Sequence, residues 1–180
     1  MKLLICSDIH GDLDSAKAVI DAYHKLSADK ILCLGDILYH GPRNDLPPTY
    51  APKEVITLLN AYKDVILSVR GNCDTEVDQM VLAFPILADY AILSLDGKTV
   101  YATHGHKFNL DTLPPLQKGD ILLHGHTHLL ACERFGEENV YLNPGSVALP
   151  KGGNPRSYMV YENGVFTCVD LQGNTIFTYE

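Results

Sequence analysis

Five short apolar runs in this sequence share one arrangement, which limits the folds open to the chain. Each run is followed within a few residues by Asp, His or Asn and by a glycine. Short apolar runs between turn residues are typical of buried strands. In open α/β sheets, polar side chains that follow the carboxyl ends of the strands collect at one edge. The sequence therefore predicts a layered protein with a polar site along the edge of its sheets.

The first half of the chain alternates these strands with amphipathic helices. Apolar residues recur at helical spacing over residues 12–26 and 52–62. Val77, Met80, Val81 and Phe84 follow the i, i+3, i+4, i+7 pattern of a third helix. The first half of the chain therefore predicts three helices.

The second half of the chain reads as mostly β. Asp96-Gly97 and Asn163-Gly164 are two-residue hairpin signals, and residues 131–135 can pair with residues 140–143. Strands in both halves and helices in the first predict an α/β (α+β) fold around two sheets. A length of 180 residues indicates a single domain over residues 1–180.

Composition argues against several classes of protein. The net charge is −8 and no basic stripe is present, so we expect no long nucleic-acid partner. No run approaches the roughly 20 apolar residues of a membrane span, so we expect no membrane partner. An odd number of cysteines without a CxxC pair is typical of a reduced, cytoplasmic protein. The cysteines are Cys6, Cys33, Cys73, Cys132 and Cys168.

The polar residues after the five runs are oxygen and imidazole donors. Together these donors favour Mn, Fe, Ni, Co or Zn over Ca or Mg. Their number exceeds what one open metal site needs, and it fits two divalent ions that share a carboxylate. Taken singly, each residue is an ordinary cap or turn residue, but that explanation accounts poorly for the whole set. The seven residues are Asp8, His10, Asp36, Asn72, His104, His126 and His128.

The formal charge of such a site bears on its substrate. Two divalent ions, two aspartates and one hydroxide leave a net charge of about +1. A singly charged phosphodiester matches that charge better than a doubly charged phosphomonoester. The preference is small, and it favours a small phosphodiester as the partner.

At these residues the chain resembles a known family. The motifs SDIHGD, LGDIL, RGNCD, THGH and HGHTH have the order and spacing of the calcineurin-like metallophosphoesterase superfamily. The longer segments GDILYHGPRN, RGNCDTEVDQM and NPGSVALPKGGNP look like those of the small bacterial phosphodiesterases of the YfcE type. The resemblance covers most of the chain. It implies a four-layer sandwich, with two mixed β-sheets flanked by helices on both sides.

The resemblance also implies a reaction and a division of the ligands. In this family a hydroxide between two metal ions attacks phosphorus directly, without a covalent intermediate. The implied cofactors are two divalent ions, with Mn as the first choice. By position, the first ion would be bound by Asp8, His10 and His128, the second by Asn72, His104 and His126, and both by Asp36.

Cys73 departs from the superfamily pattern. Most members have a histidine there, which is thought to stabilise the transition state or protonate the leaving group, oriented by the acid that follows. Here Asp74 remains without that partner. A neutral thiol is a poorer proton donor than an imidazolium. We therefore predict an altered acid position at Cys73 and Asp74, and weak protonation of the leaving group.

Two further residues are candidate substrate contacts. Arg43 lies seven residues after Asp36, and a guanidinium matches the geometry of a phosphate. An arginine on a loop surface explains it equally well. His106 lies two residues after His104, and in an extended segment the two side chains share a face.

Other functions remain open on the same fold. Some proteins of this fold, such as a retromer subunit, work as protein-interaction scaffolds with degenerate sites; the complete set of seven donors argues against this. A phosphomonoesterase or nuclease on the same scaffold is a second alternative. Exposed apolar strand edges in the second half favour a homodimer or a higher homo-oligomer.

Overall fold

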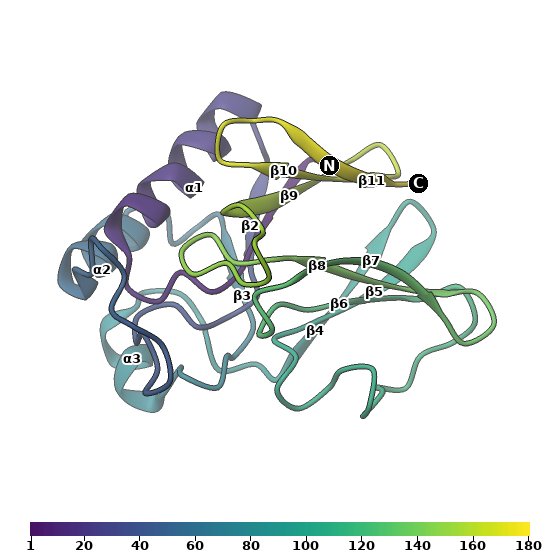
Figure 1. Ribbon diagram of the computed structural model, residues 1–180, viewed down its shortest axis with the longest axis horizontal. Coiled ribbons are helices and arrows are strands. Elements are labelled where there is room, and N and C mark those ends of the chain that lie inside the picture. Colours follow the sequence, from purple (N-terminus) through teal and green to yellow (C-terminus); the bar gives the residue numbers. More distant parts are fainter.

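The computed structural model describes residues 1–180 and contains two mixed β-sheets and three helices (Figure 1). The first sheet has six strands in the order β11-β10-β9-β1-β2-β3. Its strands β1, β2 and β3 are parallel, whereas β9, β10 and β11 return from the end of the chain and pair antiparallel. The strands are β1 (Leu3–Cys6), β2 (Lys30–Cys33), β3 (Ile66–Ser68), β9 (Ser157–Glu162), β10 (Val165–Asp170) and β11 (Thr175–Tyr179).

The second sheet has five strands in the order β4-β5-β6-β8-β7. Strands β5, β6 and β8 are parallel, and the hairpin partners β4 and β7 lie at the two edges. The two central groups of parallel strands confirm the predicted pair of mixed sheets. The strands are β4 (Tyr90–Leu95), β5 (Lys98–Thr103), β6 (Ile121–Leu123), β7 (Leu130–Phe135) and β8 (Asn139–Pro144).

The predicted hairpins are present. Asp96 and Gly97 have φ angles of 48° and 84°, and Asn163 and Gly164 have 51° and 85°. Two consecutive residues with positive φ match the right-handed twist of the flanking strands, which is why Asp-Gly and Asn-Gly occur there. Strands β7 and β8 pair antiparallel, as expected.

The alternation of side chains along β1 shows how the layers are joined. Leu3 and Ile5 point into the core between the two sheets, whereas Leu4 and Cys6 point toward the helices. All four side chains are buried, since successive residues of a strand face opposite sides. Strand β1 is therefore fixed on both faces, and so is the loop that follows it.

Helices α1 (Leu13–Leu26), α2 (Pro52–Asn60) and α3 (Glu76–Val81) all lie on the left of Figure 1, and the first two cover the first sheet. Val19 of α1 and Val55 of α2 are buried against that sheet. Asp12 caps the start of helix α1, since its carboxylate accepts a hydrogen bond from the Ser15 amide.

The expected helices on the second side are absent. On the outer face of the second sheet, a small cluster that includes Tyr101 and Tyr141 is covered in part by Leu116, from the segment between β5 and β6. That segment contains no helix. The two-sheet prediction is confirmed, but the fourth layer that the resemblance implied is not formed.

The predicted third helix is present, but it is shorter than its apolar pattern. Helix α3 forms where expected and is capped by Thr75, but none of its residues is buried. Val77, Met80 and Val81 face solvent, and only Phe84, beyond the end of the helix, enters the core. A helix of six residues is too short to carry the whole pattern, so the chain turns before its last apolar residue reaches the sheet.

No helix of the chain is both long enough and apolar enough to span a bilayer.

Candidate metal centre

The loops that carry the seven predicted donors follow β1, β2, β3, β5 and β6. The loops after β1 and β2 are joined by backbone hydrogen bonds that continue the parallel ladder. The His10 amide donates to the Asp36 carbonyl at 2.9 Å, and the Gly11 amide to the Ile37 carbonyl at 2.8 Å. The carboxyl ends of the strands therefore place the donors at one edge, as the sequence predicts.

The backbone at this edge is unusual. Five of the seven predicted donors have positive φ, between 50° and 66°, although none is glycine. This left-handed region costs a residue with a side chain of order 1 kcal/mol or more. Strain of this kind clusters at functional sites, because the surrounding structure must hold it in place. The five residues are Asp8, His10, Asp36, His126 and His128.

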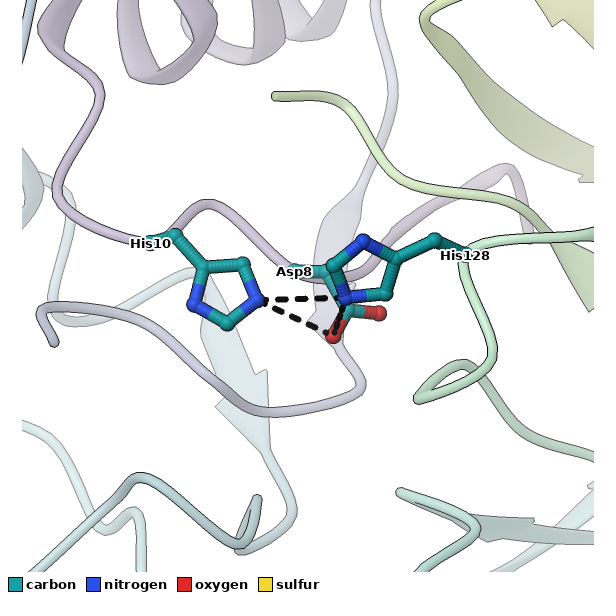
Figure 2. Close-up of side chains that lie close together, drawn as sticks. All are labelled: Asp8, His10 and His128. Atoms are coloured by element: carbon teal, nitrogen blue, oxygen red, sulfur yellow. Dashed lines mark hydrogen bonds and ion pairs between the residues drawn. The ribbon is translucent and has the colours of Figure 1, made fainter. Parts of the chain in front are cut away.

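Asp8, His10 and His128 form the first group of donors, and all three are buried. Figure 2 shows both Nε2 atoms turned toward the same carboxylate oxygen. Asp8 Oδ1 lies 3.2 Å from His128 Nε2 and 3.5 Å from His10 Nε2, and the two nitrogens are 3.3 Å apart. Asp8 Oδ2 is held separately by the Ser7 hydroxyl and the His126 amide.

The tautomers of these histidines follow from their second nitrogens. His10 Nδ1 lies 2.8 Å from the Tyr39 carbonyl, and His128 Nδ1 lies 2.5 Å from the Leu149 carbonyl. A carbonyl only accepts, so both Nδ1 atoms carry the proton. In the neutral rings both Nε2 atoms then present lone pairs to each other and to Asp8 Oδ1, which has no hydrogen-bond partner of its own. Three converging lone pairs without a donor are the arrangement that a cation fits.

Asn72, His104 and His126 form the second group. His104 donates from Nδ1 to the Leu34 carbonyl at 2.7 Å, which leaves Nε2 as the free nitrogen. That nitrogen lies 3.0 Å from Asn72 Oδ1 and 3.2 Å from His126 Nδ1. The group has the same character as the first, with imidazole nitrogens and an oxygen facing one another.

Asp36 lies between the two groups. Its Oδ2 is 3.7 Å from His10 Nε2 and 3.4 Å from His104 Nε2. Its Oδ1 accepts a hydrogen bond from the Cys73 amide at 2.8 Å, which fixes the orientation of the carboxylate. One carboxylate oxygen therefore faces both groups of donors.

Asp74 contacts backbone amides of two loops in this structure. Its Oδ2 accepts hydrogen bonds from the amides of Asp36 and Gly71, and its Oδ1 accepts one from the amide of Ile37. Both oxygens are occupied by backbone, and neither contacts the Cys73 thiol. Asp74 thus ties the loop after β3 to the loop after β2 and positions Asp36.

Close packing explains the glycine in the same loop. A Cβ on Gly71 would collide with the Asp36 carboxylate and its backbone amide. Gly125 is constrained in the same way, because a Cβ there would meet the side chains of Ser7 and Asp8. The recurrent glycines therefore allow the loops to approach one another around the donors.

Asn143 and Ser146 lie behind the donor loops. The Asn143 amide group donates to the Gly125 carbonyl and to the Thr127 hydroxyl, both at 3.0 Å. The Ser146 hydroxyl donates to the Asp8 carbonyl at 2.9 Å. The segment after β8 therefore supports the loops that carry Asp8, His126 and His128.

The electrostatics of the site favour positive charge. Burial raises the pKa of Asp8, but His10 and His128, which donate to its carboxylate when they are protonated, outweigh burial and hold this pKa well below its usual range. Burial lowers the pKa of His104, but the hydrogen bond to Asp36 and the negative charge of Asp8 raise it to about 9. Without a cation, the buried carboxylates thus favour a proton on an adjacent imidazole. The donor set, the unpartnered Asp8 oxygen and this field all fit divalent cations.

A mostly polar cavity of about 330 Å³ opens onto the donors. Arg43 lines it, as does Lys151, which the sequence reasoning missed. Neither side chain forms an ion pair, although the net charge of the chain is −8. Lys151 follows β8 by seven residues, and its amide donates to the His128 carbonyl at 3.0 Å. No strand-end pattern marks it in the sequence, because a loop brings it to the cavity.

His106 does not line this cavity. Its ring packs against those of His104 and His126, with centroid distances of 5.4 and 6.3 Å. Burial and the positive charges of His104 and His126 lower the pKa of His106 to about 4. The ring is therefore neutral at pH 7, and its position gives no support to the predicted substrate contact.

Cys73 lies at the wall of the cavity. Its sulfur is within 4.8 Å of a donor atom of His10 and one of Asp36. It accepts a hydrogen bond from the Asn72 amide group at 3.2 Å, which leaves Asn72 Oδ1 turned to His104. Burial and the negative charge of Asp36 raise the pKa of this thiol well above its usual value. The group is therefore a neutral thiol at pH 7.

Curated relatives with similar sequences include two bacterial proteins. Phosphodiesterase YfcE of Escherichia coli K12 is 46% identical over 176 residues, which cover 98% of this chain and 95% of that protein. The probable metallophosphoesterase YsnB of Bacillus subtilis 168 is 26% identical over 98% of this chain and 95% of that protein.

Solved structures show the same relationships. The E. coli phosphoesterase YfcE superimposes with a TM-score of 0.96 at 44% identity, covering 99% of this chain and 98% of that one. Vps29 of Chaetomium thermophilum has a TM-score of 0.59 at 18% identity, covering 99% and 98%, and shares the fold. Residues 1–164 match the model of the calcineurin-like phosphoesterase superfamily domain. The chain therefore belongs to the calcineurin-like phosphoesterase superfamily and is a phosphodiesterase homologue with a metal-type donor set.

Proposed function

We propose that this chain is a dinuclear metal-dependent phosphodiesterase that acts on a small phosphodiester. The shared Asp36 oxygen carries the proposal, because it faces His10 in one donor group and His104 in the other. The E. coli relative named a phosphodiesterase supports the choice of reaction at 46% identity.

The donors divide into two sets by their contacts. Asp8, His10 and His128 would hold one ion, and Asn72, His104 and His126 the other, with Asp36 common to both. Imidazole and carboxylate together suit Mn, with Fe, Ni, Co and Zn as the competing ions. Two such ions would polarise the phosphoryl oxygens and activate a water for attack on phosphorus.

The residues of the chain supply positioning and charge. The Asp74 carboxylate keeps Asp36 oriented through the backbone, and the Asn143 amide supports the loop of His126 and His128. Arg43 and Lys151 line the cavity, where their positive charges would bind the oxygens of the phosphate. His106 would act through its packing against His104 and not as a substrate contact.

Metal analysis combined with hydrolysis assays tests this proposal. We expect about two divalent ions per chain after Mn loading, and hydrolysis of bis(p-nitrophenyl) phosphate that stops when a chelator removes them. Recovery of the rate on Mn addition separates metal loss from denaturation. A folded protein that binds two ions and hydrolyses neither this diester nor p-nitrophenyl phosphate would instead support the scaffold alternative.

The phosphomonoesterase alternative has its own outcome in the same assay. The charge of the loaded site favours the diester, so we expect kcat/KM for the diester to exceed that for p-nitrophenyl phosphate. The reverse order would identify a phosphomonoesterase.

The homodimer stays a prediction. We also propose a reducing, cytoplasmic location, because all five cysteines are free.

Replacement of Cys73 by His is expected to change which leaving groups the enzyme expels. A buried neutral thiol is a weak proton donor, so native rates should fall steeply as the leaving alcohol becomes more basic. A general acid contributes roughly 10²–10⁴-fold. Cys73→His should therefore raise kcat for alkyl leaving groups by about 10-fold or more, with little change for p-nitrophenolate.

A series of phosphodiesters with graded leaving-group pKa provides the measurement. Cys132→His is the matched control, since Cys132 is exposed on β7. A native rate that does not vary with leaving-group pKa would overturn this expectation.

A further inference from the structure

An apolar groove adjoins the metal centre. It has a volume of about 360 Å³ and lies between the loop after β2, helix α2 and helix α3. Tyr39 and Tyr50 line it from the loop, Ile56 from α2, and Val77 and Val81 from α3. Seven of its eleven lining residues are hydrophobic, in contrast to the mostly polar cavity over the donors.

The apolar side chains along this groove are exposed to an unusual degree. The exposed fractions of Val77 and Val81 are 69% and 43%, and that of Tyr39 is 42%. Val77 and Val81 belong to the i, i+3, i+4, i+7 apolar pattern of α3. Single exposed apolar residues are common, but a contiguous apolar patch marks a site where a ligand or partner binds. The α3 face therefore lacks its partner within the chain.

The groove adjoins the catalytic cavity at one side chain, which forms a common wall. Cys73 lines both. Its sulfur lies within 4.8 Å of donor atoms of His10 and Asp36. Tyr39 joins the groove to the same donors, since its carbonyl accepts the hydrogen bond from His10 Nδ1 at 2.8 Å. A group attached to a phosphate at the metal centre therefore has an apolar surface directly beside it.

We propose that this groove binds an apolar arm of the phosphodiester, an aryl or short alkyl group. The proposal rests on the proposed function and narrows its substrate class. The shared wall at Cys73 favours this occupant, because one molecule can place its phosphate at the metal centre and its apolar arm in the adjoining groove. A second copy of the chain on the α3 face is the competing occupant.

Binding of alkylphosphonates to the Mn-loaded protein tests the groove separately from catalysis. An alkylphosphonate carries its alkyl group on a C–P bond, which a phosphodiesterase does not hydrolyse. It has only one alkyl arm, so a gain in affinity with chain length reports on a single binding surface. Full burial of one CH₂ strengthens binding by about fourfold. At half burial this becomes about twofold per CH₂, so hexylphosphonate should bind about 30-fold more tightly than methylphosphonate in calorimetric titrations.

The variant Val77→Asp places a charge in the groove without disturbing the core. Position 77 is in the first turn of α3, where an acidic residue is favourable to the helix. We expect the hexyl-to-methyl affinity ratio to fall to about threefold, since a carboxylate keeps the groove hydrated. Ile92→Asp is the matched control on β4, and it should keep the native ratio.

The outcomes separate the two proposals. If the protein hydrolyses bis(p-nitrophenyl) phosphate but binds the two phosphonates with equal affinity, the proposed binding of an apolar arm in the groove is wrong. The proposed phosphodiesterase activity is then unaffected. A hexyl-to-methyl affinity ratio that Val77→Asp leaves unchanged would also contradict binding of the apolar arm in the groove. Absence of hydrolysis by the Mn-loaded protein overturns both. Equal phosphonate affinities, with a native dimer that Val77→Asp converts to monomer in sedimentation, assign the groove to a second copy.

Discussion

Replacement of Asp36 by Asn is expected to lower kcat by about 10³-fold or more and to reduce the bound metal to one ion per chain or fewer. Asp36 Oδ2 is the oxygen that faces both donor groups, at 3.7 Å from His10 Nε2 and 3.4 Å from His104 Nε2. Asparagine has the same shape but removes a negative charge and supplies a weaker ligand. Kinetics and metal analysis on the same sample measure the two effects.

The control for this variant is Asp45→Asn. Asp45 is exposed in the loop that follows β2, so the same loss of charge occurs outside the donor groups. We expect its kcat and metal content to stay within about twofold of native. Retention of both ions and of native kcat by Asp36→Asn would exclude Asp36 as the shared ligand.

Replacement of Asp74 by Ala is expected to lower the free energy of unfolding of the metal-free protein by about 4 kcal/mol. The change leaves three buried amides, those of Asp36, Ile37 and Gly71, without their acceptor. Each unsatisfied buried group costs about 1–3 kcal/mol, and partial relaxation or water entry recovers some of the sum. Urea unfolding of the metal-free protein measures the effect without a contribution from bound ions.

The control is Asp21→Ala on the exposed side of α1, which should change the free energy of unfolding by less than about 0.5 kcal/mol. An equally small change for Asp74→Ala would contradict the role of Asp74 in holding the loops after β2 and β3 together. Metal affinity provides a second readout. We expect it to fall in Asp74→Ala, because Asp36 loses the bond that fixes its backbone amide.

Local patterns predicted the strands and the hairpins well, because these depend on neighbouring residues. The apolar runs before Asp8, Asp36 and His104 are strands β1, β2 and β5. The Asp-Gly and Asn-Gly pairs form hairpin turns because their residues tolerate positive φ. The parallel pairing then brings the strand ends together, as the predicted site requires.

The predictions that failed depended on packing between distant elements. The spacing of Val77, Met80 and Val81 is that of a buried helical face, yet no sheet surface is available to cover it. The second sheet lacks outer helices, because the segment between β5 and β6 covers part of that face without forming one. Periodicity identifies an apolar face but not its partner.

The roles of Asp74 and Lys151 were also outside the reach of local pattern. Asp74 follows Cys73 in the sequence, yet its oxygens face the backbone of the loop after β2. Lys151 reaches the cavity through the turn after β8. Both placements follow from contacts between residues more than 20 positions apart, whose partners the sequence does not specify.

The sequence by itself determined which side chains are available at the strand ends, since strand length and turn residues are local properties. Tertiary structure decided how these side chains face one another. Asp8, His10 and Asp36 have positive φ, which their residue types disfavour. Ladder bonds between the loops and the Asp74 carboxylate hold these loops in place. A strained backbone is stable only when many distant contacts fix it, so its geometry exists only in the folded chain.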